Sequence, residues 1–189
     1  MGENLKTTQF NDGTPIPTGF ATSEAWMIQC GSDLPACQVD RAANADAPGA
    51  MQYRNLYGVL YNLFAMKGNI APQGWHVPSK AELQALVDFV GADARKLKST
   101  AIGKGLGSWM ESAGIEGDNL TGFTALPANT VEGSNGSTGA SETTGQWWST
   151  EADYRIRMSF RSNSVEQLTP GAAGLGEGNS IRCVRDANY

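Results

Sequence analysis

The clearest alternation of hydrophobic and polar positions lies in the last quarter of the chain. Between residues 154 and 161, large apolar side chains stand at even positions and arginines or serine at odd ones. Side chains of a β-strand point alternately to its two faces, so this pattern predicts a strand with one buried face. The apolar face would carry Tyr154, Ile156, Met158 and Phe160. The polar face would carry Arg155, Arg157, Ser159 and Arg161.

A helical pattern occupies residues 79–91. Its apolar residues recur three and four positions apart, which places them on one side of a helix: Leu83, Leu86, Val87 and Val90. Ser79 and Glu82 have the spacing of a capping box, and Gly91 is typical of a helix end. The pattern therefore predicts a helix that begins after Ser79 and ends at Gly91.

The rest of the chain shows short apolar segments between long polar ones. Residues 53–66 fit both a strand and a helix, and periodicity does not separate the two. Residues 128–146 and 169–180 are rich in small and polar residues and predict long surface loops, with a closing strand at 181–184. We expect an α+β fold with short antiparallel strands, one or two helices and long loops.

Composition supports one domain over residues 1–189 and excludes several classes. The chain has 23 glycines, and its charged residues amount to 17%, below the roughly 25% of an average domain. A net charge of −5 argues against general nucleic-acid binding. No apolar run approaches the roughly 20 residues of a membrane span.

Catalytic and metal-binding patterns are scarce. The single histidine, His76, excludes histidine-rich metal sites, and no nucleotide-binding or hydrolase pattern is present. We therefore expect no enzyme activity and no cofactor. Cys30 and Cys37 stand seven residues apart, which fits either a small disulfide loop or two reduced thiols, and Cys183 fits a buried position.

Seven blocks, in order along almost the whole chain, resemble the Fibrobacter succinogenes major paralogous domain family. They are ENLKTT at 3–8, NDGTPIP at 11–17, YGVLYN at 57–62, GWHVPS at 74–79, GFTALP at 122–127, WWSTE at 147–151 and RCVRD at 182–186. The resemblance implies a C-type-lectin-like fold, with paired N- and C-terminal strands and long loops on one side. It also implies a protein of a bacterial cell surface or a virion.

Some proteins of this kind are the variable proteins of diversity-generating retroelements. By that resemblance, residues 1–146 are the scaffold, and residues 147–186 form a variable region that contacts ligands. The family usually begins a few residues earlier, with a tryptophan, so we expect a signal or anchor to be missing from this chain. Its variable region is often rich in Tyr or Asn, whereas here Arg, Ser, Ala and Gly prevail.

The arginine face of the predicted strand is the main candidate binding site. Guanidinium groups two residues apart would lie roughly 7 Å from each other and could hold an anionic group. Alternatively, the face is solvated, or its arginines pair with Glu151, Asp153 or Glu166. The residues expected to contact a ligand are Trp148, Tyr154, Arg155, Arg157, Ser159, Arg161, Asn163, Glu166, Gln167 and Leu168.

Trp147 and Trp148 could form a stacking platform, but neighbours on a strand face opposite sides, so we expect Trp147 in the core and Trp148 at the rim. The sequence therefore favours a binding module for a protein or glycan ligand. A structural or adhesive surface protein is the competing hypothesis, and an enzyme on a formylglycine-generating-enzyme-like fold is the weakest one.

Overall fold

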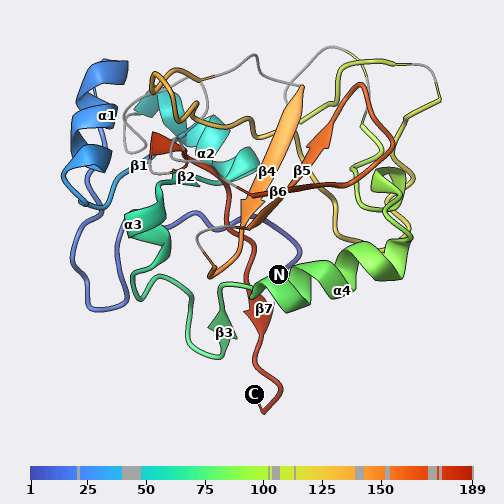
Figure 1. Ribbon diagram of the computed structural model, residues 1–189, viewed down its shortest axis with the longest axis horizontal. Helices are drawn as coiled ribbons and strands as arrows, with labels where there is room; N and C mark the ends of the chain where they lie inside the picture. Colours follow the sequence, from blue (N-terminus) through green and yellow to red (C-terminus); the bar gives the residue numbers. More distant parts are fainter. Residues whose placement is uncertain are drawn as a thin grey trace.

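The computed structural model describes residues 1–20, 22–39, 48–101, 103, 107–112, 114–138, 143–151, 154–169, 174 and 176–188. The α-helices in these ranges are α1 (Ser23–Gly31), α2 (Met51–Tyr57), α3 (Leu63–Met66) and α4 (Lys80–Val90). The strands are β1 (Cys37–Gln38), β2 (Leu60–Tyr61), β3 (Trp75–His76), β4 (Thr144–Trp148), β5 (Arg155–Ser159), β6 (Glu166–Leu168) and β7 (Val184–Arg185). The α+β class is confirmed (Figure 1).

Helix α4 matches its sequence pattern. The Ser79 hydroxyl accepts a hydrogen bond from the backbone N–H of Glu82, and the Glu82 carboxylate accepts one from the backbone N–H of Ser79. These bonds satisfy N–H groups that the first helical turn leaves free. Gly91 ends the helix at φ 66°, a left-handed conformation that suits glycine.

The ambiguous segment 53–66 divides into α2, β2 and α3. Gly58 ends α2 at φ 81°, and a Cβ atom there would lie 2.7 Å from the Leu5 carbonyl oxygen. Glycine thus lets the N-terminal segment pass close beside the turn. The structure has more helices than the one or two expected. Helix α1 was not predicted because only Trp26 and Cys30 are buried in it, so its sequence has no regular apolar face.

Three small antiparallel sheets join distant parts of the chain: β1–β2, β3–β7 and β4–β5–β6. Strand β3 pairs with β7, so His76 lies opposite Val184 near the C-terminus. The N-terminal segment joins the same region, because the Leu5 N–H donates to the Ile181 carbonyl at 2.8 Å. Helix α4 packs on one side of the three-stranded sheet (Figure 1).

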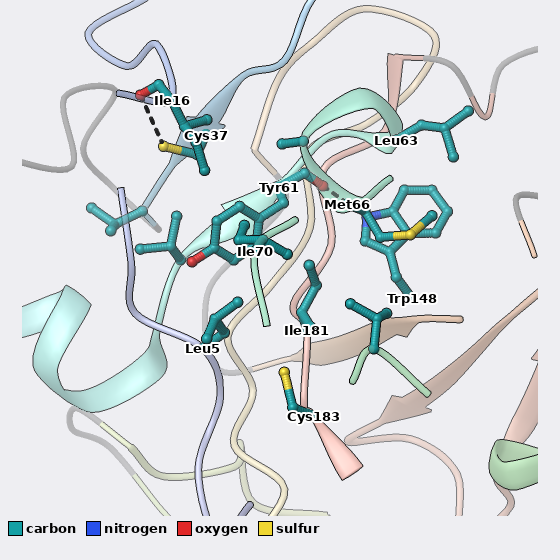
Figure 2. Close-up of a cluster of buried hydrophobic side chains, with 14 of the residues drawn as sticks. Leu5, Ile16, Cys37, Tyr61, Leu63, Met66, Ile70, Trp148, Ile181 and Cys183 are labelled. Carbon is teal, nitrogen blue, oxygen red and sulfur yellow. Dashed lines mark hydrogen bonds between the residues drawn. The ribbon is translucent and has the colours of Figure 1, made fainter. Parts of the chain in front are cut away.

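Strand β4 separates two hydrophobic clusters. Trp147 packs with α4 and with Ile156 and Met158 of β5. Trp148 packs on the other side, among Tyr61, Met66 and Ile181, where its indole N–H donates to the Tyr61 carbonyl at 2.7 Å (Figure 2). Both tryptophans have no exposed surface.

The two glycine-rich and polar stretches are not simple surface loops. In the part that the structure describes, the Val131 N–H donates to the Gly178 carbonyl, and the Ser180 N–H donates to the Gln146 carbonyl of β4. Val131, Asn179 and Ser180 are fully buried. Residues 139–142, 170–173 and 175 of these stretches lie outside the described residues. Both stretches therefore contribute to the core beside the sheet.

Candidate binding surface

The three-stranded sheet presents one polar face, which follows from its register. Residues directly opposite each other in antiparallel strands point to the same side. Arg157 stands opposite Gln146 on one neighbour and Glu166 on the other, and Ser159 stands opposite Thr144. We call the following set the polar face: Thr144, Gln146, Arg155, Arg157, Ser159, Glu166 and Leu168.

Arg157 and Glu166 form the half-exposed centre of the polar face. The Arg157 Nε donates to a Glu166 carboxylate oxygen at 2.9 Å, and the two side chains keep 38% and 31% of their surface exposed. Of the alternatives left open by the sequence, pairing of an arginine with Glu166 is the one observed here. An ion pair this exposed is worth at most about 1 kcal/mol, so a ligand can displace it at low cost.

Arg155 is buried rather than on the surface, where the alternation of the strand had predicted it. Its Nε donates to Gln146 at 2.9 Å and its Nη2 to Glu177 at 2.7 Å, with side-chain exposures of only 10% and 13% for the ion pair. Burial lowers the pKa of the Arg155 guanidinium and raises that of the Glu177 carboxyl. Glu177 comes from the glycine-rich stretch, which covers this end of the face.

Arg161 and Asn163 project from the turn between β5 and β6, where both are exposed. Lys98 stabilises this turn, because its ammonium donates to the carbonyls of Ser159 and Ser162, each at 2.7 Å. Burial lowers the pKa of Lys98 to about 8. The Arg161 backbone N–H donates to the Ser159 hydroxyl, so the exposed Arg161 and Asn163 stand on a supported turn that follows β5.

Four further predicted contact residues differ in where they lie. Tyr154 is 2% exposed and points to the opposite side of the sheet, where its hydroxyl donates to the Gln167 side chain at 3.0 Å. Gln167 is exposed but shares that side, because it stands opposite Ile156. Trp148 is not at the rim as expected, because Tyr61 and its neighbours cover it. Leu168 is half-buried on the polar face, opposite Arg155.

Neither of the two acidic residues beside β5 is seen to pair with an arginine. The Glu151 carboxylate accepts from the backbone N–H of Lys80 at the start of α4 and makes no ion pair with an arginine in the described residues. Asp153, the second candidate partner, lies outside those residues.

None of the three cysteines forms a disulfide in the structure. Cys30 and Cys37 are buried in separate hydrophobic clusters, so the alternative of a small disulfide loop is not realised. The Cys37 thiol instead donates to the Ile16 carbonyl (Figure 2). Cys183 is buried, as its apolar neighbours in the sequence predict.

Asn4 joins the sheet to both chain ends, a role that sequence reasoning missed. Its amide oxygen accepts from the Trp147 indole at 2.8 Å and from Arg182 Nη2 at 2.9 Å. Its amide nitrogen donates to the Tyr57 carbonyl at 2.8 Å and to the Ser180 hydroxyl at 3.3 Å. The only signal in the sequence was that Asn4, Trp147 and Arg182 each belong to one of the seven blocks that resemble the family.

The sequence model of the Fibrobacter succinogenes major domain matches residues 1–185. This chain belongs to that family. The match includes the first block and all but the final residue of the last one, and these two blocks meet at Asn4 and Arg182 in the folded Fibrobacter succinogenes major domain. No curated protein and no solved structure matches the chain.

Neither a metal cluster nor a membrane-spanning helix occurs in the part of the chain that the structure describes. Among these residues, no group of three or more His, Cys, Asp or Glu side chains is arranged to hold a metal ion. Within the same residues, every helix is too short or too polar to cross a membrane.

Proposed function

We propose that this domain is a non-enzymatic binding module that recognises a protein or a glycan through the exposed part of the polar face and the adjoining turn. The observation that supports it best is the contrast between the two sides of β5. Ile156 and Met158 are fully buried, whereas Arg157 on the other side is half-exposed, and Arg161 on the turn that follows is exposed. A strand anchored in the core thus presents polar side chains to solvent from a fixed position.

The contact residues of this proposal are those that remain accessible. They are Arg157, Ser159, Arg161, Asn163, Glu166 and the edge residue Leu168. Arg155, Tyr154 and Trp148 support the surface from within. Arginine and glutamate side by side offer both donors and acceptors, which suits hydroxyl-rich glycans and polar protein surfaces alike.

We further propose that the protein works outside a bacterial cell or on a virion, as a target of a diversity-generating retroelement. The support is the family membership together with the position of the polar face, most of which lies within residues 147–186. The neighbouring DNA should then encode a reverse transcriptase and a template repeat that matches codons 147–186. The absence of both removes this part of the proposal.

A printed glycan array and an array of purified cell-surface proteins provide the binding test. Each ligand found is measured again with the double variant Arg157→Ala/Arg161→Ala. The matched control is Lys6→Ala/Lys67→Ala, which removes the same charge away from the polar face. We expect at least about tenfold weaker binding for the first variant and less than about twofold change for the control. Binding should persist after dialysis against a chelator.

A structural or adhesive surface protein is the second candidate. The observation that favours it is that the exposed arginines already have partners, since Arg157 pairs with Glu166 and the Arg161 guanidinium lies 4.9 Å from the centre of the Phe160 ring. Such a face needs no ligand. Failure to find any specific ligand on both arrays supports this candidate against the first.

A further inference from the structure

A pocket of about 380 Å³ lies between α4, β7 and the Phe123 segment, away from the polar face. Its volume falls within the range of small-molecule sites. Its walls are largely apolar: Trp75, Pro78, Leu83, Leu86, Phe123 and Trp147. Such walls favour a ligand with an apolar body.

One wall of this pocket carries a buried cation, Arg182, which is 5% exposed. Its hydrogen-bond acceptors are the neutral Asn4 side chain and the Phe123 carbonyl. The guanidinium also lies 4.3 Å from the centre of the Phe123 ring. Among the described residues, no carboxylate lies within 4.0 Å of it. The negative charge of Glu3 acts on Arg182 from beyond that distance. A buried charge with no carboxylate in contact is costly, so an anion in the pocket would relieve that cost.

Donors remain for such an anion. A guanidinium has five N–H groups, and the bonds to Asn4 and Phe123 use three of them. Burial lowers the pKa of Arg182 to about 10, so the group still carries its charge at neutral pH. It can therefore donate to a carboxylate that enters the pocket.

The charges at the mouth of the pocket also favour an anionic ligand. Arg185 lines it and is exposed. Among the described lining residues, the one acidic side chain is Glu82, whose carboxylate is already engaged by His76 at 2.8 Å and by the Ser79 hydroxyl at 2.8 Å. An entering anion thus meets two guanidinium groups and one occupied carboxylate.

We propose that this pocket binds a small carboxylate with an apolar body, whose carboxylate is held by Arg182 and whose body contacts Leu83, Leu86 and Trp75. The site is separate from the polar face, so it does not rest on the proposed function. The combination of an apolar wall and a buried cation excludes cationic ligands and disfavours neutral ones.

The test compares three probes that share one body: 4-phenylbutyrate, 4-phenylbutanol and 4-phenylbutylamine. Each is titrated into the full chain while the indole N–H signals of Trp75 and Trp147 are followed by NMR. We expect 4-phenylbutyrate to shift both signals and to bind at least about tenfold more tightly than the alcohol, because the alcohol cannot form the charge-assisted bond. The amine should not bind.

Variants locate the site. Arg182→Gln should abolish the preference for the acid over the alcohol. Because that variant removes a buried residue, Leu86→Trp provides a second test, since it fills the pocket and leaves Arg182 in place. Its matched control is Phe89→Trp, on the same helix but 79% exposed. Arg157→Ala/Arg161→Ala should bind the probe as the parent does, which separates this site from the polar face.

Three results would overturn the proposal. One is the absence of any shift at millimolar 4-phenylbutyrate. Another is equal binding of the acid and the alcohol. The third is undiminished binding of the acid to folded Leu86→Trp.

Discussion

Replacement of Asn4 by alanine is the most informative test of how the domain is held together. The Asn4 side chain is 3% exposed and lies where the N-terminal segment, β4 and the segment before β7 meet. Alanine removes the amide but keeps the backbone. The Tyr57 carbonyl, the Trp147 indole N–H and the Arg182 guanidinium then lose a partner inside the core.

The magnitude follows from these orphaned groups. A buried polar group without its partner costs about 1–3 kcal/mol, and a charged one costs more. Three such groups, with partial relaxation, lower the free energy of unfolding by about 3–6 kcal/mol. Typical domains have about 5–15 kcal/mol in all. At about 2–4 °C per kcal/mol for a chain of this size, the melting temperature falls by roughly 6–24 °C.

Denaturation with guanidinium chloride, followed by circular dichroism, measures this change in the free energy of unfolding. Asn11→Ala is the matched control, because Asn11 belongs to the same N-terminal segment but is exposed, with its amide bonded to Asn69 and to the Ala71 carbonyl. The control should lose less than about 1 kcal/mol. The reasoning is refuted if Asn4→Ala and Asn11→Ala unfold with free energies within about 1 kcal/mol of each other.

Four further outcomes are expected. Ser79→Ala, which breaks the capping box with Glu82, should lower the free energy of unfolding by about 1 kcal/mol in the same assay. Trp148→Phe should lower it by about 2–4 kcal/mol, because the Tyr61 carbonyl loses its donor in the core; a change below about 0.5 kcal/mol contradicts its burial. Hydrogen bonds to Asp186, and secondly to Glu82, raise the pKa of His76. Protonated His76 therefore stabilises the fold fully below pH 6.5, and this stabilisation is lost as pH rises through the folded-state pKa. His76→Gln should remove this part of the pH dependence of the free energy of unfolding. The three buried cysteines should react with a thiol reagent only after denaturation, and fast reaction of the folded chain contradicts their burial.

Local patterns predicted the elements that depend only on local chemistry. Helix α4 was predicted correctly because its cap, its apolar spacing and its terminal glycine all lie within residues 79–91. The alternation of β5 was also correct, since Ile156 and Met158 are buried and Arg157 is not. Each of these signals can be recognised without knowledge of the rest of the fold.

The errors concern side chains whose surroundings come from distant segments. Trp148 lies on the same side of the sheet as Arg157, as its position requires, but Tyr61 and Ile181 cover it. Arg155 is buried because Glu177 returns over it from a stretch whose composition is typical of a polar loop. The covering residues are far from both side chains in the sequence, so period-two reasoning assigned both to the surface.

The most direct test of recognition through the polar face is the affinity of the two double variants for a ligand identified on the arrays. We predict that Arg157→Ala/Arg161→Ala binds at least about tenfold more weakly while Lys6→Ala/Lys67→Ala binds as the parent does. We also predict melting temperatures within a few degrees of the parent for both, because the Arg157–Glu166 pair is half-exposed. Equal affinity of both variants for the ligand would contradict the polar face as the recognition surface.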